Sequence, residues 1–366
     1  MKKRTLLYII HDIQLGGVEV ALVSAIPKLS EHYDLTVAVL GQIDPKMISH
    51  LSDSQKSCFK TFDYPLISYP FNIFRIAFSL LKMKPDIMIS SLWRASLAGR
   101  IVKAIDRTIV FIPFIHSTTF FHLCDKIFTL LAIRSADQVF TDSSAATNFI
   151  QKEHSPGCPV TAISFFTQKS PAEKSNPPLS GDVIRFMFLG RLNPVKNLPL
   201  AIDTIGALRS RGLNAHLDIF GRDDGMLADI QKHIARNNLQ SFVKFQGELN
   251  ADQKMQAFRE HHFLIQLSFR EGMAMSVAEA MQNGLVCFVT PVGEIQNYAE
   301  DMHTAVFANT GSEEEWAASL EKLETCASDP IMYQQIANNC FEHFKEVVTY
   351  ADSLTAAIDQ ISGGSG

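Results

Sequence analysis

Short apolar segments alternate with segments of helical periodicity along the first half of the chain. The apolar segments are mostly continuous rather than alternating, which is typical of parallel strands covered on both faces. Helical patterns such as Val18–Leu29 and Ser96–Ile105 separate them, so this half predicts a doubly wound open sheet. The predicted strands are Thr5–His11, Leu35–Leu40, Asp86–Ser90, Ile109–His116 and Gln138–Thr141.

A proline-containing break divides the chain near its middle. Residues 169–181 contain three prolines and show no periodicity, which is typical of an interdomain linker. The alternation of strands and helices then restarts, with predicted strands at Ile184–Gly190, Ala215–Gly221, Phe242–Gly247, Phe263–Ser268 and Leu285–Thr290.

The sequence therefore predicts an α/β protein of two Rossmann-like domains, each a doubly wound parallel sheet, that face each other across a cleft. We expect the N-terminal domain at residues 1–168, a linker at 169–183 and the C-terminal domain at 184–361. Residues 362–366 end in Gly-Gly-Ser-Gly and resemble a flexible linker scar, so they are left out of the predicted fold.

Composition agrees with a folded protein of this size. The chain has 366 residues, 46% hydrophobic and 19% charged, which suits two globular domains. The initial apolar stretch is too short for a signal peptide, and no apolar run reaches the roughly 20 residues of a spanning helix. The six cysteines form no C-x-x-C pair, so we expect buried thiols in a reducing cytoplasm rather than disulfides or zinc.

Charge is distributed unevenly between the two halves. Residues 1–168 carry 17 Lys and Arg against 13 Asp and Glu, whereas residues 169–366 carry 16 against 25. The acidic total argues against nucleic acid as a partner. The mildly basic first half suits either an anionic membrane or an ordinary solvated surface.

A pair of glycines follows the first predicted strand. Ligands of open parallel sheets bind at the carboxyl ends of strands, and Gly16 and Gly17 precede a predicted helix. Glycines at this place let backbone N–H groups approach a phosphate or a sugar closely. A purely structural turn explains them equally well.

Two cations follow the first predicted strand of the second half. Gly190 is succeeded by Arg191 and, five residues later, by Lys196. A diphosphate leaving group needs such cations, because negative charge grows on it as the glycosidic bond breaks. The alternative is a pair of solvated surface cations.

Two glutamates bracket the start of a predicted helix. Glu271 lies in a loop and Glu279 lies about two turns into the helix, among apolar neighbours. The segment Gly272–Met275 between them can present unpaired N–H groups to an anion. Glu271 would then face sugar hydroxyls, and Glu279 would bind a vicinal diol such as ribose. A helix-surface charge is the alternative for Glu279.

Taken in order, these motifs resemble one family. A Gly-Gly pair near the start, G-R-x-x-x-x-K, E-x7-E and the strand and loop from Gly284 through Thr290 to Gly293 are similar to those of retaining glycosyltransferase family 4, among the glycosyl transferases group 1. This family has the GT-B architecture of two α/β halves. The resemblance covers nearly the whole second half and the opening of the first, and it is thin between Ile43 and Gln138.

The resemblance implies roles for individual residues. Arg191 and Lys196 would bind the diphosphate, Glu271 the donor sugar and Glu279 the ribose, while backbone around Met273–Ser276 would hold the phosphates and the sugar. His116 matches the histidine that the family places near the transferred sugar. The residues predicted to bind the nucleotide sugar are Gly16, Gly17, Gly190, Gly272, Met273, Ala274, Met275, Ser276 and Glu279, and those predicted to act in catalysis are Arg191, Lys196, Glu271 and His116.

Three positions depart from the family pattern. Glu294 stands where the family often has a second glycine, Asn297 where it has a glutamate, and Ala274 where it has a small turn residue. These departures concern the contacts to the donor sugar rather than the diphosphate site.

The expected activity is transfer of a hexosyl group with retained anomeric configuration, from a UDP-sugar or, second, GDP-mannose. The acceptor would be a hydroxyl of a glycan or lipid-linked glycan, in polysaccharide or lipopolysaccharide synthesis. No D-x-D motif occurs, so we expect no cofactor and no obligatory metal. Two alternatives stay open: a sugar-nucleotide epimerase of the same architecture, and a non-catalytic nucleotide-binding protein.

The first half of the chain, which would recognise the acceptor, holds an apolar segment with basic residues. Residues 64–84 combine a wide apolar face with Arg75, Lys82 and Lys84, and phenylalanines such as Phe120, Phe121 and Phe128 add bulk to this half. An interfacial helix at the inner face of the cell membrane is one interpretation. A helix of the protein core is the other.

Overall fold

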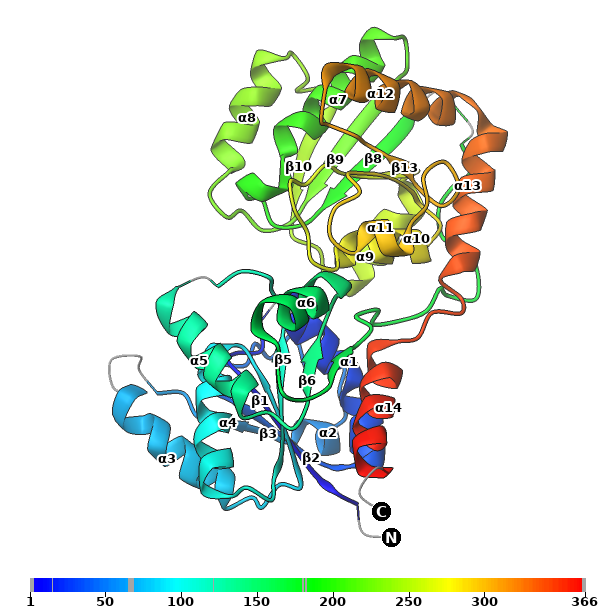
Figure 1. The fold of residues 1–366 in the computed structure, drawn as a ribbon. Coiled ribbons are helices and arrows are strands. Elements are labelled where there is room, and N and C mark those ends of the chain that lie inside the picture. Colours follow the sequence, from blue (N-terminus) through cyan, green and yellow to red (C-terminus); the bar gives the residue numbers. More distant parts are fainter. Residues whose placement is uncertain are drawn as a thin grey trace. The chain divides into compact units, whose positions relative to one another are not determined.

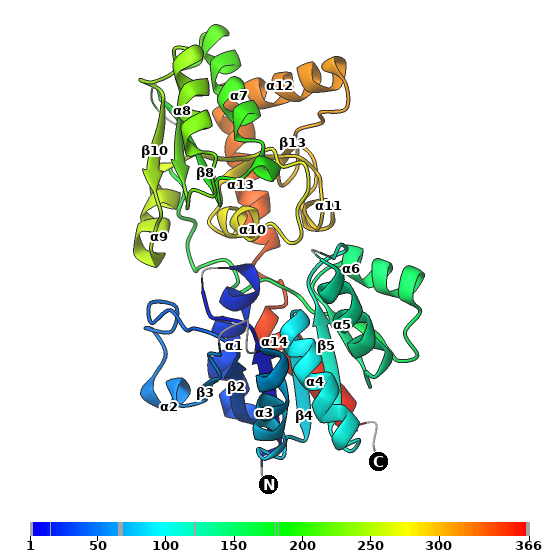
Figure 2. The same ribbon diagram turned by 90° about the vertical axis from the view of Figure 1, so that its left-hand side faces the viewer.

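The computed structural model describes residues 3–14, 16–64, 69–120, 122–179, 181 and 183–363. It divides into two compact units (Figures 1 and 2). The first unit comprises Met1–Gln168 and Val348–Gly366, and the second comprises Lys169–Val347. Leu15, Phe121 and residues 65–68 and 364–366, which include part of the predicted interfacial segment and of the predicted scar, lie outside the described residues.

The first unit is built on a seven-stranded sheet in the order β3-β2-β1-β4-β5-β6-β7. Every described pair is parallel. Its strands are β1 (Thr5–Ile10), β2 (Asp34–Val39), β3 (Phe59–Thr61), β4 (Ile87–Ser91), β5 (Val110–Ile115), β6 (Val139–Thr141) and β7 (Val160–Ala162). Its helices are α1 (Gly17–His32), α2 (Asp53–Lys56), α3 (Tyr69–Leu81), α4 (Trp93–Ile105), α5 (Leu123–Arg134), α6 (Ser144–Phe149), a π-helical turn (Ile150–His154) and α14 (Tyr350–Gly363).

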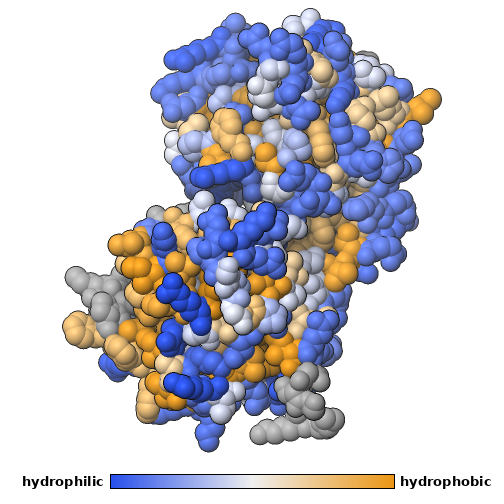
Figure 3. Space-filling model, in the orientation of Figure 1, coloured by the Kyte–Doolittle hydropathy of each residue, from blue (hydrophilic) through white to orange (hydrophobic). Residues whose placement is uncertain are grey.

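Helices cover both faces of this sheet. Leu7 and Ile9 of β1 pack with buried residues of α3 and α4. Tyr8 lies one residue out of phase with them, and successive side chains of a strand point to opposite faces; its hydroxyl meets that of Tyr350 on α14. Hence α3 and α4 lie on one face and α14 on the other. On the outer surface of this unit, hydrophobic side chains are visible over α3 and α5 (Figure 3).

The second unit is built on a six-stranded parallel sheet in the order β10-β9-β8-β11-β12-β13. Its strands are β8 (Ile184–Leu189), β9 (Ala215–Phe220), β10 (Val243–Gly247), β11 (Phe263–Gln266), β12 (Val286–Val289) and β13 (Val306–Phe307). Its helices are a 3₁₀ turn (Pro194–Lys196), α7 (Leu198–Ser210), α8 (Leu227–Arg236), α9 (Ala251–Glu260), α10 (Met275–Gln282), α11 (Ile295–Tyr298), α12 (Glu313–Ser328) and α13 (Pro330–His343).

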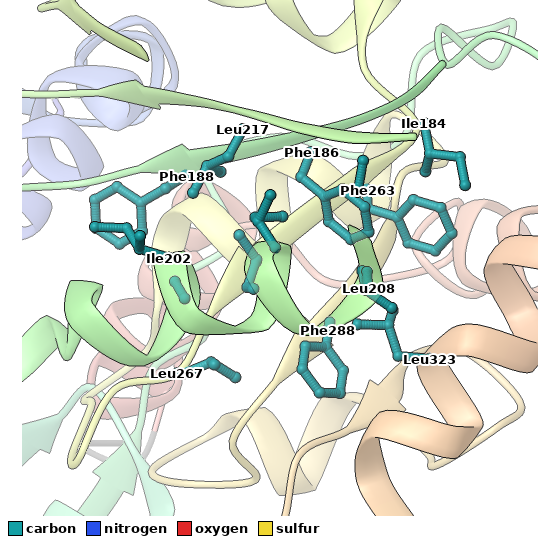
Figure 4. Packing of buried hydrophobic residues seen from close by; sticks show 14 of the residues in the cluster. Ile184, Phe186, Phe188, Ile202, Leu208, Leu217, Phe263, Leu267, Phe288 and Leu323 are labelled. Atoms are coloured by element: carbon teal, nitrogen blue, oxygen red, sulfur yellow. The ribbon is translucent and has the colours of Figure 1, made fainter. Parts of the chain in front are cut away.

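The core of the second unit explains why β11 and β12 are almost entirely apolar, since every residue of both strands is buried. Phe186 and Phe263 on neighbouring strands stack at 4.8 Å between ring centroids, and helices α7 and α12 cover them with Leu208 and Leu323 (Figure 4). Full burial of such a side chain stabilises the fold by about 1.5–3 kcal/mol. Polar residues alternate with apolar ones only toward one edge of this sheet, along β9 and β10, where Lys244 and Gln246 are exposed.

All ten predicted strands are present, within two residues at either end. The sequence analysis missed β3, β7 and β13. Each of these has only two or three residues and lies at an edge of its sheet. An edge strand this short has no buried run that a hydrophobic pattern could reveal.

The C-terminal helix departs from the predicted domain boundary. The sequence analysis placed residues 184–361 in one domain, whereas the structure groups Val348–Gly366 with the first unit. There Lys28 pairs with Asp352, and the Tyr33 hydroxyl donates to Asp359 at 2.6 Å. Helix α14 also runs through Gly363, into the predicted scar. These partners lie more than 300 positions apart, so local periodicity does not reveal them.

Candidate active site

Three loops meet at the carboxyl edge of the second sheet. They follow the adjacent strands β8, β11 and β12, and backbone hydrogen bonds join them. The Phe269 N–H donates to the carbonyl of Val195 at 2.9 Å, and the Glu294 N–H donates to that of Gly272 at 2.9 Å. Since ligands of open parallel sheets bind at this edge, the loops form the candidate site of this unit.

Lys196 and Glu271, predicted from separate motifs, form an ion pair in this site. The Lys196 ammonium donates to both Glu271 carboxylate oxygens, at 2.7 and 3.0 Å. Both side chains are largely buried, with 17% of the Lys196 and 9% of the Glu271 side chain exposed. A buried pair of this kind holds the ammonium at one position.

Two further side chains, which the sequence analysis missed, hold the Glu271 carboxylate. Gln266 donates to its Oε1 at 2.7 Å and Ser268 at 2.5 Å. The Ser276 hydroxyl in turn donates to Gln266 Oε1 at 2.8 Å. The only signal in the sequence was position, because Gln266 and Ser268 lie in the last three residues of the predicted strand Phe263–Ser268.

Arg191 lies outside this cluster. Its side chain is 61% exposed, and its guanidinium pairs with Asp224 of the β9–α8 loop at 3.4 Å; Arg222 pairs with the same carboxylate at 3.2 Å. Exposed ion pairs are worth about 0–1 kcal/mol. Arg191 can therefore leave Asp224 for an anionic ligand at little cost. The sequence analysis assigned no role to Asp224 or Arg222.

The floor of the site depends on a glycine that the sequence analysis did not select. Gly221 has a φ of +139°, and a Cβ at this position would overlap the carbonyl oxygen of Gly190. The Gly190 N–H donates to the Phe220 carbonyl at 3.0 Å. Only glycine combines this backbone conformation with so close an approach, so Gly221 allows β8 and β9 to end side by side beneath the loops.

The loop before α10 has the open donors that the sequence predicts. Among the described residues, no acceptor is paired with the backbone N–H groups of Gly272, Met273, Ala274, Met275 and Ser276. Ala274 is the residue that enters the helix and has a left-handed φ of 52°. These N–H groups at a helix N-terminus suit an anion.

Tyr298, another residue missed from the sequence, supports this loop. Its hydroxyl donates to the carbonyls of Met273 at 3.2 Å and Ala274 at 3.4 Å. Burial raises the pKa of Tyr298 well above its ordinary value, so the hydroxyl keeps its proton. Gly293, with a φ of +62°, packs against the carbonyls of Glu271 and Gly272 from the other side.

Glu279 is buried rather than a surface charge. Its carboxylate accepts a hydrogen bond at 2.8 Å from Lys254 of α9. The Lys254 side chain is more exposed than that of Glu279, so the pair lies at the edge of the core. Lys254 sits on a polar helix and gave no signal in the sequence.

In the first unit, His116 follows β5 and is almost fully buried. Its Nε2 lies 3.0 Å from the Ser91 hydroxyl, and its Nδ1 faces the Asp142 carboxylate at 3.4 Å. Ser91 also meets the Tyr8 hydroxyl at 2.7 Å. The sequence analysis missed Asp142 and Ser91, although each lies at the end of a predicted strand.

This polar chain reaches the C-terminal helix. The hydroxyls of Tyr8 and Tyr350 are 3.4 Å apart. Burial raises the pKa of Tyr8 to about 12 and that of Tyr350 well above its ordinary value. Both hydroxyls therefore stay neutral, and a chain of polar contacts runs from Tyr350 of α14 through Tyr8 and Ser91 to His116.

The structure places Gly16 and Gly17 at the N-terminus of α1. Gly16 has extended backbone, which any residue adopts, and a Cβ there would meet the Glu19 carboxylate. The predicted contact with a diphosphate stays a prediction. Beside this loop, His11 Nε2 accepts a hydrogen bond from the Arg94 N–H at 2.8 Å. Burial, and then the Arg94 charge, lower the pKa of His11 to about 3, so His11 is neutral.

Among the described residues, no three His, Cys, Asp or Glu side chains are grouped as metal ligands would be.

Comparisons with known proteins place this geometry in a family context. Residues 170–343 match the family model described as glycosyl transferases group 1. No match was found among curated protein sequences.

The whole fold is similar to solved structures. HepE from Anabaena, solved in complex with UDP, has a TM-score of 0.80 at 18% identity, over 98% of this chain and 100% of that one; it was also solved with UDP-glucose. The lipopolysaccharide outer core galactosyltransferase WaaB gives 0.73 at 15% identity, over 98% and 99% of the two chains. Sucrose-phosphate synthase from Thermosynechococcus elongatus gives 0.77 at 14% identity, over 99% and 100%. The predicted resemblance to the glycosyl transferases group 1 is confirmed over residues 170–343, which match that family's model, and the chain has the GT-B fold of two parallel-sheet domains.

Proposed function

We propose that the protein is a retaining glycosyltransferase that moves a hexosyl group from a nucleotide sugar to a hydroxyl of a glycan or lipid-linked glycan. The family of residues 170–343 supports glycosyl transfer. The single observation that carries the proposal is the Lys196–Glu271 pair beside the open N–H groups of the α10 loop. A UDP-sugar is favoured over GDP-mannose, because the similar HepE was solved with UDP-glucose.

In this proposal Lys196 and the α10 loop stabilise the departing diphosphate. Negative charge grows on the leaving group as the glycosidic bond breaks, and preorganised cations and N–H donors lower the barrier most where that charge develops. Glu271 holds the ammonium in place and directs its remaining lone pairs to sugar hydroxyls. Arg191, exposed and weakly paired with Asp224, adds a second positive charge.

In this proposal the anomeric configuration is retained because the acceptor attacks from the same face that the diphosphate leaves. Glu271 is the carboxylate of the cluster, but it already accepts hydrogen bonds from Lys196, Gln266 and Ser268. A carboxylate held by three donors is a poor nucleophile. We therefore propose front-face attack, in which a donor phosphate oxygen assists deprotonation of the acceptor hydroxyl and the sugar passes through an oxocarbenium-like state.

His116 is proposed to contact the transferred sugar. Asp142 at its Nδ1 and Ser91 at its Nε2 leave the ring one orientation, and a histidine near the reaction is effective only when oriented. No obligatory metal or cofactor is part of the proposal, and we place the reaction in the cytoplasm, in cell-envelope polysaccharide or lipopolysaccharide synthesis.

The test is release of free nucleoside diphosphate by purified protein from a panel of UDP-, GDP- and ADP-sugars, with and without candidate glycan lipids. We expect release that depends on acceptor, from a UDP-sugar. Conversion of donor without acceptor, and without release, would identify the epimerase instead. Binding with no turnover of any donor, even with the acceptor supplied, would leave a non-catalytic nucleotide-binding protein and refute the proposal.

A further inference from the structure

Three neighbouring helices of the first unit expose most of the large apolar side chains that reach its solvent surface. Helices α3, α4 and α5 pack side by side. Seven of the ten exposed large apolar residues of the described chain lie on them: Phe71, Phe74, Phe78, Ile105, Leu123, Ile127 and Leu131. We call this set the α3–α5 surface (Figure 3). Apolar residues gathered in this way, rather than scattered singly, indicate a binding surface.

Helix α3 is apolar on two faces. One face, with Ile73, Ile76 and Leu80, is buried in the core. The other carries phenylalanines at positions 71, 74 and 78, and Phe71 is 80% exposed. A helix that only covers a core needs one apolar stripe, and its opposite face is polar. The core interpretation is therefore confirmed for one face of α3, and the interfacial interpretation stays a prediction for the other face.

Helix α5 repeats this arrangement. Leu123, Ile127 and Leu131 recur every four residues and form one exposed stripe, because residues four apart lie on the same side of a helix. Thr129, Ala132 and Ile133 are the buried residues of its other side. Two exposed apolar stripes thus flank α4.

Basic residues surround these stripes. Residues 69–134 contain nine Lys and Arg against three Asp and Glu, a net charge of +6 in a chain of net charge −5. Arg75, Lys82, Arg107, Lys126 and Arg134 are exposed and form no ion pair within the described residues. The Lys82 ammonium lies 4.8 Å above the Phe78 ring, so a cation lies directly beside an exposed aromatic side chain.

We infer that the α3–α5 surface docks on a bilayer rich in anionic lipid. The phenylalanines and leucines enter the boundary between headgroups and acyl chains, and the unpaired cations contact acidic headgroups. Charge complementarity favours this occupant over a second copy of the chain, because an isologous dimer would bring the exposed cations of two copies, which form no ion pair within the described residues, against each other. Among the described residues no helix is long and apolar enough to cross a membrane.

Topology adds a consequence for the proposed function. Helices α3 and α5 follow β3 and β5, so both begin at the carboxyl edge of the sheet, where His116 lies. The docked face brings that edge to the lipid, where a lipid-linked acceptor would be anchored. The choice of acceptor rests on the proposed function, whereas membrane docking does not.

The test is co-sedimentation of the full chain with vesicles of phosphatidylcholine, either pure or with about 30% phosphatidylglycerol. We expect binding to the anionic vesicles, weak binding to the neutral ones, and loss of binding as salt rises from about 0.05 to 0.5 M. The double variant Phe71→Ser with Phe74→Ser should reduce vesicle binding at least about tenfold. The matched control is Ile331→Ser with Val348→Ser, two residues exposed elsewhere, and it should bind as the parent does.

Each outcome has a defined meaning. Melting temperatures of the variants exclude misfolding. A charge variant, Lys82→Glu with Lys126→Glu, is an independent test and should also lose binding to anionic vesicles. Equal binding of parent and both variants, or no binding to anionic vesicles, overturns the inference. A concentration-dependent dimer that the phenylalanine variant abolishes assigns the surface to self-association and also overturns it. Release of nucleoside diphosphate with a water-soluble acceptor is measured in parallel, so failed docking and failed transfer are told apart.

Discussion

The two units share one architecture but use their charged and apolar side chains differently. At the carboxyl edge of the second sheet, Lys196, Glu271 and Glu279 are paired and largely buried. In the first unit, unpaired cations and phenylalanines such as Phe71 lie on an outer face, and His116 sits in a buried polar chain. The second unit matches a family model, and the first lies outside that match.

Under the proposed function, the two units would divide the labour of binding donor and acceptor. Binding a diphosphate makes the same electrostatic demand of every nucleotide-sugar enzyme, so it favours one fixed arrangement of cations and N–H donors. Recognition of an acceptor or a membrane depends on surface chemistry, which many sequences can supply. Four predictions test whether the two units are specialised in this way.

The largest effect is expected from Lys196→Ala in the second unit. Removal of this cation should lower kcat/KM about 10²–10³-fold, and loss of a partner of Glu271 should cost about 1–3 kcal/mol of stability. Steady-state kinetics measure the change in kcat/KM, and urea unfolding measures the change in stability. Lys345→Ala, at an exposed ion pair, is the control. A loss of stability with no loss of turnover in the folded fraction would make Lys196 structural.

The second effect is alkaline destabilisation of the first unit. The pKa of Tyr8 is raised by burial from 10.0 to about 12, so the folded state keeps a proton that the unfolded chain releases. The stability that this proton contributes is complete below pH 10 and is lost as pH rises toward 12, by about 2–3 kcal/mol. The free energy of unfolding, measured with urea, should depend less on pH between 10 and 12 for Tyr8→Phe than for the parent or for Tyr64→Phe. Parallel curves for all three would contradict the burial argument.

A smaller effect is expected from Asp142→Asn. The carboxylate faces His116 Nδ1, and its loss should reduce turnover about tenfold while the fold persists. Because Asp142 acts through His116, it is a positioning residue, and the pH profile of kcat/KM should change as well. The surface change Glu31→Gln is the control. An unchanged profile with normal turnover would remove His116 from the proposed chemistry.

The smallest effect is expected from Glu279→Ala. Its partner Lys254 is partly exposed, so the stability cost is small. If Glu279 binds the ribose, nucleotide affinity should fall a few-fold, or about 1 kcal/mol. The measurement is the shift in melting temperature that UDP produces, which should shrink in the variant. An identical shift in parent and variant would assign Glu279 to packing with α9.

Much of the fold could be predicted because the local pattern of apolar residues indicates which segments are buried. Strands covered on both faces are mostly apolar, so β1, β11 and β12 show as nearly continuous apolar runs. Residues directly after such strands, such as Gly190 and His116, must lie at the carboxyl edge of a parallel sheet. The sequence by itself therefore determined the two-domain α/β class, the candidate loops and the family resemblance.

Only the tertiary structure decided which of these residues are partners. Lys196 and Glu271 are 75 positions apart, and Tyr8 and Tyr350 are 342 apart; the order of strands in the sheet and the direction of each side chain bring them together, and neither is encoded in local periodicity. The same holds for α14, which packs on the first unit although it follows the second, and for the outer stripe of α3. An amphipathic pattern states how much apolar surface a helix has, but what covers that surface depends on which elements the fold places beside it.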